Sequence, residues 1–377
     1  MKKPTRFPFV LLLLALLLPL PNPLFAQNTK AFYIGHSLSD QIPDMVKSLS
    51  DDHPEAGFDW RYQWIPGAPL WWQWARKAMQ DYDPIPPHYV GFYDTANGLP
   101  AGGFDVLVLT ESVPRNLASI SETYQFADSF YVFASQYNPG LRAFVYELWH
   151  CLDSGTPTGC DYDTDSSPWR QRLTDDLPMW ESVVDTLNAR FQPENPVCLI
   201  PVGQGLARLH DAIQAGTVPG INDIEDLFSD RIHLHDWGKY FVACIHFSAI
   251  HKRSPVGLTH QLQVWWGGNF NAPPPALALK FQELAWETVL QYPRNCLDIS
   301  NVTARGRTTL EPLRLMPCPA TDFLRLDYPG EALPWSVFDL TGRLVSSGHG
   351  REVDVRSLPD GVYLVRAGEA VGRFVKG

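Results

Sequence analysis

Apolar runs alternate with amphipathic segments between residues 27 and 297. Five short, mostly apolar runs have the length of buried strands, at residues 31–34, 58–64, 104–110, 141–148 and 197–202. Segments with helical periodicity lie between them, including residues 42–49, 120–134, 180–190 and 205–214. Strands that alternate with helices predict one α/β domain with a parallel sheet, whose ligands bind beyond the C-terminal ends of the strands.

The pattern changes after residue 297. Residues 298–309 are polar and predict a linker, and the chain from residue 310 to 377 has the short alternating runs of β-strands. These runs are residues 323–327, 335–339, 344–346, 353–355 and 362–366, separated by the turn sequences LTGR and PDG. The tail is therefore expected to form a small all-β sandwich.

The N-terminus has the pattern of a signal peptide. Lys2, Lys3 and Arg6 precede an apolar run at residues 9–18, and Ala26 offers a small residue for cleavage. The run is shorter than the roughly 20 residues that span a bilayer, and no second stretch reaches that length, so a transmembrane anchor is not expected. We predict that residues 1–26 are removed on export.

Composition limits the classes of partner. The 377 residues are 45% hydrophobic and carry a formal net charge of −11, with no basic run that would suit nucleic acid. Export permits disulfides, and Cys151 and Cys160 bracket a short polar loop that closes easily. The sequence leaves four cysteines unassigned, as buried thiols or in further pairs: Cys198, Cys244, Cys296 and Cys318.

A candidate nucleophile follows the first predicted strand, in the sequence Gly35-His36-Ser37. A serine at a strand-to-helix turn is exposed at the edge of the sheet, where backbone N–H groups and the helix N-terminus favour an oxyanion. The alternative is that Ser37 or Ser39 only caps the following helix.

A candidate base lies near the other end of the domain. Asp230 and His233 are three residues apart on one predicted loop, so the carboxylate can orient the imidazole. The alternatives are a solvated surface loop, His235 as the base, or a metal site formed by His233, His235 and Asp236. The spacing lacks a further His and the Asp position of a metallo-hydrolase motif, so we expect neither a metal nor another cofactor.

The two ends together resemble the SGNH (GDSL-like) hydrolase superfamily, over about residues 30–255. The resemblance implies a flavodoxin-like three-layer sandwich with a five-stranded parallel sheet. It also implies Ser37 as nucleophile, His233 as base and Asp230 as its orienter. Gly67, after the second strand, matches the glycine of the second motif, so its backbone N–H and that of Ser37 would form the oxyanion hole.

Two positions depart from that family pattern. His36 stands where the family name implies Asp, and the third motif reads Leu-Thr-Glu-Ser at residues 109–112 in place of Gly-x-Asn-Asp. The usual oxyanion Asn is therefore missing. Glu111 donates no hydrogen bond unless it is protonated, and Asn116 is the nearest substitute.

Further residues at the strand ends suggest contacts with substrate. Glu111 follows the third predicted strand, whereas Glu147 and Gln204 lie at the ends of the fourth and fifth, either to bind substrate hydroxyl groups or to make internal hydrogen bonds. Many tryptophans lie near the candidate site, and a sugar ring stacks well on an aromatic face, although most tryptophans are buried in cores. These are Trp60, Trp64, Trp71, Trp72, Trp74, Trp265 and Trp266.

The tail resembles the C-terminal sorting domain of the type IX secretion system of Bacteroidetes. Four motifs occur in order: PCPAT at 317–321, FDLTGR at 338–343, LPDGVY at 358–363 and RFVK at 373–376. Cys318 departs from the family, which usually has Asn there. The resemblance implies the type IX machinery as a partner and a secreted or cell-surface location. A carbohydrate-binding or adhesion module is the alternative.

The sequence therefore predicts an exported serine esterase or deacetylase that acts on a small acyl ester or an acylated glycan. Two alternatives use the same residues. A catalytically impaired glycan-binding protein would explain the missing Asn, and an acyltransferase would pass the acyl group to a sugar instead of water.

Overall fold

The structure is a computed structural model that describes residues 28–76, 86–115, 119–153, 160, 162–297, 314–317, 319–327, 334–339, 344–367 and 370–377. The predicted signal peptide and linker, together with Asn116 and Cys318, lie outside these described residues.

The α/β domain is built on one parallel sheet of five strands, ordered β2-β1-β3-β4-β5. The strands are β1 (Thr29–Gly35), β2 (Phe58–Trp64), β3 (Val106–Thr110), β4 (Arg142–Tyr146) and β5 (Cys198–Ile200). Each predicted apolar run overlaps one strand, so the predicted sheet is confirmed. The chain first adds β2 on one side of β1 and then β3 on the other, which leaves a crevice beyond the C-terminal ends of β1 and β3.

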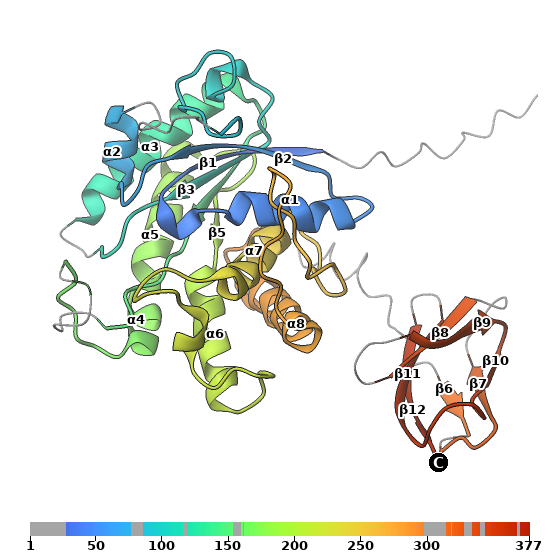
Figure 1. Ribbon diagram of the computed structural model, residues 1–377. Coiled ribbons are helices and arrows are strands. Elements are labelled where there is room, and N and C mark those ends of the chain that lie inside the picture. The colour runs from blue at the N-terminus through green and yellow to red at the C-terminus, as the bar shows by residue number, and fades with distance from the viewer. Residues whose placement is uncertain are drawn as a thin grey trace, which may run out of the picture.

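Helices cover both faces of this sheet and complete three layers (Figure 1). α1 (Ile42–Asp52), α7 (Asp236–His251) and α8 (Pro275–Gln291) contact one another in series, and α2 (Leu70–Arg76), α3 (Ile120–Tyr137) and α5 (Leu177–Phe191) form a second series. α4 (Trp169–Asp175) and α6 (Val202–Gln214) are the remaining α-helices in the described part of the domain. The sequence analysis missed α2, α4 and α8.

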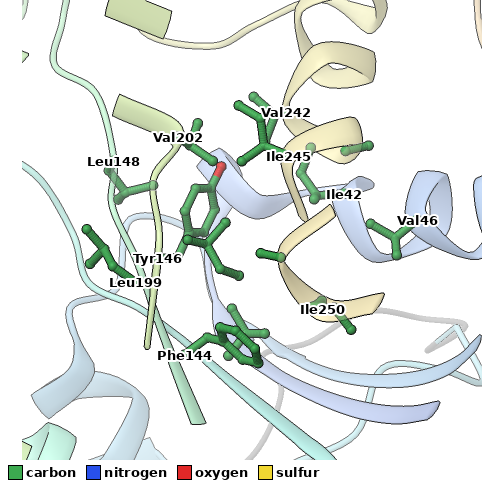
Figure 2. Close-up of a cluster of buried hydrophobic side chains, with 14 of the residues drawn as sticks. Ile42, Val46, Phe144, Tyr146, Leu148, Leu199, Val202, Val242, Ile245 and Ile250 are labelled. Atoms are coloured by element: carbon green, nitrogen blue, oxygen red, sulfur yellow. The ribbon is translucent and has the colours of Figure 1, made fainter. Parts of the chain in front are cut away.

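Apolar side chains from α1, β4 and α7 form part of the main core (Figure 2). Val46, Tyr146 and Val242 are each fully buried there. Burial of one such side chain contributes roughly 1.5–3 kcal/mol. The Tyr146 hydroxyl also donates to the Leu38 carbonyl oxygen at 3.2 Å. This packing holds the start of α1, and the turn before it, against the sheet.

The C-terminal unit has two antiparallel sheets around its own core. One contains β6 (Arg314–Met316), β7 (Phe323–Asp327) and β10 (Glu352–Asp354). The other contains β8 (Pro334–Asp339), β9 (Leu344–His349), β11 (Gly361–Ala367) and β12 (Ala370–Lys376). The predicted all-β tail is confirmed, although β6 and β12 were not predicted as strands.

Two disulfides cross-link the α/β domain. The predicted Cys151–Cys160 pair is confirmed, and Cys198 of β5 pairs with Cys296 after α8. The second pair decides between the two alternatives left open for Cys198, whereas Cys244 is a free thiol buried within α7. No helix in the described part of the chain is long and apolar enough to cross a membrane.

Candidate active site

Ser37 lies on a tight turn between β1 and α1. Gly35 ends the strand, where an added Cβ would lie 2.9 Å from the Thr110 Oγ1, so a side chain would clash with β3. The short 3-10 helix η1 (Ser37–Ser39) follows directly. Ser39 is fully buried, and its hydroxyl lies 2.7 Å from the Tyr62 hydroxyl. Ser37 is only partly buried, so the turn presents Ser37 and hides Ser39.

His36 supports this turn from beneath. Its Nδ1 accepts the Leu38 backbone N–H at 3.4 Å, and its Nε2 lies 3.1 Å from the Glu111 carbonyl oxygen. A carbonyl oxygen only accepts, so Nε2 carries a proton. Nδ1 accepts a hydrogen bond and carries no proton, so the ring is neutral. Burial lowers the pKa of His36, which agrees with the neutral form. A neutral His here ties the turn to the end of β3.

Ser37, His233 and Asp230 form a continuous hydrogen-bonded series. The His233 Nε2 lies 2.9 Å from the Ser37 Oγ, and the His233 Nδ1 lies 2.7 Å from the Asp230 Oδ2. An ionised carboxylate only accepts, so Nδ1 carries the proton and Nε2 is free to accept from Ser37. The structure thus brings together three residues from the two ends of the domain, in the geometry of a nucleophile, a base and an orienting acid.

The Asp230 carboxylate also shapes its own loop. Its Oδ1 accepts the backbone N–H of Ile232 at 2.8 Å and that of His233 at 2.7 Å. Burial raises the pKa of Asp230, but these hydrogen bonds and the one from the His233 side chain outweigh it and lower the pKa overall. The Ser229 backbone N–H donates to the His233 carbonyl oxygen at 2.8 Å and closes the loop.

The neighbouring His235 has a different place. Its Nδ1 accepts the Trp237 backbone N–H at 3.1 Å, and its Nε2 reaches the Asp226 carbonyl oxygen at 2.6 Å. His235 therefore caps α7, and it is His233 that faces Ser37. Asp236 accepts the Asn271 backbone N–H at 2.7 Å. In the described residues no group of three or more His, Cys, Asp or Glu side chains is arranged to hold a metal ion.

The predicted oxyanion donors lie on adjacent segments. Gly35 pairs with Trp64 in the sheet, and the Ile65 backbone N–H donates to the Gly35 carbonyl oxygen at 3.0 Å. The loop that carries Gly67 therefore runs beside the Ser37 turn. Gly67 has a φ of +62°, a conformation that favours glycine. Within the described residues, neither the Ser37 nor the Gly67 backbone N–H donates to a protein acceptor.

Glu111 contacts both of these segments, through His36 and Leu70, and is 2% exposed. Its Oε1 accepts from the Leu70 backbone N–H at 3.1 Å and from the Arg115 guanidinium at 2.7 Å, and its Oε2 accepts from the Thr123 hydroxyl at 2.9 Å. Glu111 thus joins the segment after Gly67 to the end of β3 and to α3. This geometry favours the internal role that the sequence left open, and contact with substrate stays a prediction.

Glu147 and Gln204 bond to each other at the ends of β4 and β5. The Gln204 side chain donates to the Glu147 Oε1 at 2.7 Å, and its backbone N–H donates to the Oε2 at 3.1 Å. Burial raises the pKa of Glu147 to about 8, against these hydrogen bonds. Their substrate role also stays a prediction, because both carboxylate oxygens already have internal partners.

The loop after β4 holds the loop of His233 in place, a contact that the sequence analysis missed. The buried Trp149 donates its indole N–H to the Ile232 carbonyl oxygen at 2.8 Å. The Leu152 backbone N–H donates to the Arg231 carbonyl oxygen, also at 2.8 Å, and Cys151 of the disulfide lies between these two anchors. We call residues 149–152 the clamp segment.

Fold and site together define an α/β domain with a Ser-His-Asp constellation at the C-terminal edge of its sheet. Residues 314–376 match the family model of the secretion system C-terminal sorting domain. No curated protein matches the chain.

Solved structures with a similar fold include enzymes. A DUF4886 family protein from Bacteroides uniformis has 13% identity and a TM-score of 0.48, covering 70% of this chain and 95% of its own. A candidate SGNH hydrolase from Slackia heliotrinireducens has 17% identity and a TM-score of 0.36, covering 59% and 98%. A carbohydrate esterase family 3 structure from Talaromyces cellulolyticus has 15% identity and a TM-score of 0.32, covering 59% of this chain and 97% of its own. At these identities the resemblance says nothing about activity.

Proposed function

We propose that the protein is an exported serine hydrolase that cleaves carboxylic esters, with acylated carbohydrate as its substrate. The observation that carries the proposal is the hydrogen-bonded series from the Ser37 Oγ through His233 to Asp230, at 2.9 and 2.7 Å. A binding protein needs no such series, because what the series provides is activation of the serine.

The proposed reaction has two steps. The Ser37 Oγ attacks the acyl carbonyl carbon while its proton passes to the His233 Nε2, and the backbone N–H groups of Ser37 and Gly67 donate to the oxyanion. The carbon–oxygen bond to the alcohol breaks, and His233 returns the proton to the leaving alkoxide. Water then attacks the acyl-enzyme with His233 again as base, which releases the acid and regenerates the Ser37 hydroxyl.

The oxyanion hole departs from the expected pattern at one position. The third position, where the resemblance leads one to expect an Asn donor, is Glu111, whose carboxylate oxygens accept hydrogen bonds. Loss of one oxyanion donor costs roughly 10²–10³-fold in rate. This observation favours the second candidate function, a catalytically impaired glycan-binding protein, and rate measurements separate the two.

Export is proposed from the two ends of the chain. The basic and apolar pattern of residues 1–26 would direct the chain across the inner membrane, with cleavage after Ala26. The sorting domain would then hand it to type IX secretion, at the cell surface or into the medium.

Labelling by a fluorophosphonate probe tests the activated serine. We expect wild-type protein to be labelled and Ser37→Ala to be unlabelled, with Ser129→Ala on the surface of α3 as the control for loss of a serine. Asp230→Asn keeps the size of the side chain but removes the charge, and we expect labelling to slow by about 10²–10⁴-fold. Equal labelling of wild type and Ser37→Ala would contradict the proposal.

A panel of acetylated sugars then tests the substrate, with release of acetate as the readout. If the protein hydrolyses p-nitrophenyl acetate but releases no acetate from any sugar, it is a serine esterase and the proposed carbohydrate substrate is rejected. Folded protein without either activity would support the glycan-binding alternative.

A further inference from the structure

A cavity lies on the domain beside the edge strand, and no residue of the triad lines it. It has a volume of about 620 Å³ and lies between α1, β2 and residues 259–267. We call it the hairpin groove. Aromatic and charged side chains line it together, and those used below are Lys47, Asp51, Asp59, Trp60, His88 and Trp265.

The wall formed by residues 259–267 is held in place by α1. Asp44, Ser48 and Asp52 are spaced four residues apart and therefore lie on one face of the helix. They accept the backbone N–H of Trp265 at 3.1 Å, of Gln263 at 3.0 Å and of Thr259 at 2.7 Å. Three hydrogen bonds along one helix face make this wall a built part of the fold.

Trp265 is at the end of a tight hairpin. The Val264 backbone N–H donates to the Gly268 carbonyl oxygen at 2.8 Å, and Gly267 has a φ of +94° at the turn. Trp265 is 37% exposed and lines the groove, whereas the adjacent Trp266 is 60% exposed and does not line it. The protein thus exposes part of a large aromatic ring inside a concave surface, where a flat apolar ligand face can stack.

Aromatic rings connect the groove to the candidate active site. Trp265 contacts His88 at 5.7 Å between ring centroids, and His88 stacks on Trp60 at 4.5 Å. Tyr89 contacts Trp60 at 6.1 Å and stacks on Trp64 at 6.2 Å. Trp64 is three residues before Gly67, so this series of rings runs along the edge strand towards the oxyanion loop.

The charges in the groove define the ligand further. Its lining contains four aspartates and one lysine, so its field is negative and repels anions. Lys47 forms an ion pair with Asp51, and Asp59 accepts from Arg61 at 3.1 Å, so both carboxylates have a cationic partner. Carboxylates and an imidazole are suitable hydrogen-bond partners for hydroxyl groups.

We propose that the hairpin groove binds a neutral saccharide chain, with one sugar ring stacked on Trp265 and its hydroxyl groups bonded to the carboxylates and His88. This inference rests on the proposed function and deepens it, because it makes the substrate a polymer that extends along β2 away from Ser37. An acylated monosaccharide bound at Ser37 would not reach the groove. An acidic polysaccharide would be repelled by the aspartates of the groove.

Calorimetry on the full chain tests the groove independently of catalysis. Ser37→Ala is the background, so that a bound glycan is not deacylated. The probes are neutral xylo-, cello- and chito-oligosaccharides as hexamers and dimers, with oligogalacturonate as the anionic probe. We expect at least one neutral hexamer to bind about tenfold more tightly than its dimer, and the anionic hexamer to bind more weakly than that neutral hexamer.

The variants Trp265→Ala and Trp266→Ala, added to this background, form a matched pair on the same hairpin. We expect Trp265→Ala to weaken hexamer binding about tenfold and Trp266→Ala to change it less than twofold. Trp265→Phe keeps a ring and should fall between them. Thermal unfolding of each variant checks that the hairpin change has not unfolded the domain.

Two outcomes would overturn the proposal that the hairpin groove binds a saccharide: no neutral hexamer binds, or Trp265→Ala and Trp266→Ala bind the hexamer equally well. Hydrolysis of p-nitrophenyl acetate by wild-type protein reports on the proposed function separately. If the protein is active but binds no oligosaccharide, only the proposed role of the groove is rejected. If it is inactive but its binding depends on Trp265, the role of the groove stands and the hydrolase proposal is rejected.

Discussion

At the scale of single residues, hydrogen-bond partners separate side chains of the same type. His233 and His235 are two positions apart, yet one faces Ser37 and the other caps α7. His36 is a third case, since its Nε2 proton is directed to a carbonyl oxygen and stabilises the turn. The chemistry of an imidazole here follows from what its two nitrogens touch.

Glu147 provides a pH test at the same scale. Burial raises its pKa from an ordinary 4.5 to about 8, so the folded protein holds this proton more tightly than the unfolded chain does. This contribution to stability is complete below about pH 4.5 and is lost as the pH rises towards 8. In Glu147→Gln the contribution is absent, so wild type should lose stability relative to the variant over this range, by at most about 1.4 kcal/mol per pH unit.

Urea unfolding of both proteins at pH 5 and pH 8 measures the change. The exposed Glu194→Gln is the control, and its difference from wild type should stay constant with pH. The same difference between wild type and Glu147→Gln at both pH values would show that the carboxyl is ionised in the folded state, through its bonds to Gln204.

At the scale of elements, the site depends on contacts between loops that are far apart in the sequence. The clamp segment donates two hydrogen bonds to the loop of Asp230 and His233. Ile232 of this loop packs against the main core, whereas 39% of the His233 side chain is accessible to solvent. We infer that the clamp segment sets the distance between His233 and Ser37.

Trp149→Phe tests this positioning role. Phe keeps an aromatic ring in the core but cannot donate to the Ile232 carbonyl oxygen, so the loop of His233 loses one anchor. A displacement of His233 that costs about 1.4 kcal/mol of transition-state stabilisation lowers kcat about tenfold. We expect kcat for p-nitrophenyl acetate to fall with little change in KM. Trp180→Phe makes the same substitution at another fully buried position, in α5, and should lower stability without lowering kcat. Equal kcat in both variants would argue against the clamp.

At the scale of the whole molecule, the chain has two separate hydrophobic cores. The main core includes side chains from Ala31 to Leu297, whereas the core of the sorting domain begins at Ala320. Both disulfides lie within the α/β domain. Its stability is therefore expected not to depend on the tail.

A chain that ends at residue 297 tests this independence. We expect its thermal unfolding temperature and its fluorophosphonate labelling to match those of the full chain within error. In cells with a type IX system, the shortened protein should stay inside the outer membrane while the full chain reaches the surface or medium. Loss of folding on truncation would show that the two cores depend on each other.

The sequence by itself determined the features that rest on local pattern. All five strands of the sheet, the helices at 42–49 and 120–134, the all-β tail and the Ser37, Asp230 and His233 candidates follow from periodicity and short motifs. α2 and α4 were missed because helices of seven residues have too few turns for a period to show. Local pattern also led to the Cys151–Cys160 pair, since nine positions separate its members.

Only the tertiary structure decided which distant groups meet. Cys198 and Cys296 are 98 positions apart, and Ser37 and His233 are 196 apart. The internal bonds of Glu111 and Glu147, the clamp segment and the hairpin groove likewise join segments that no spacing relates. The physical reason is that a side chain's partners depend on how the layers pack, and packing is a property of the whole core, which no single stretch of sequence contains.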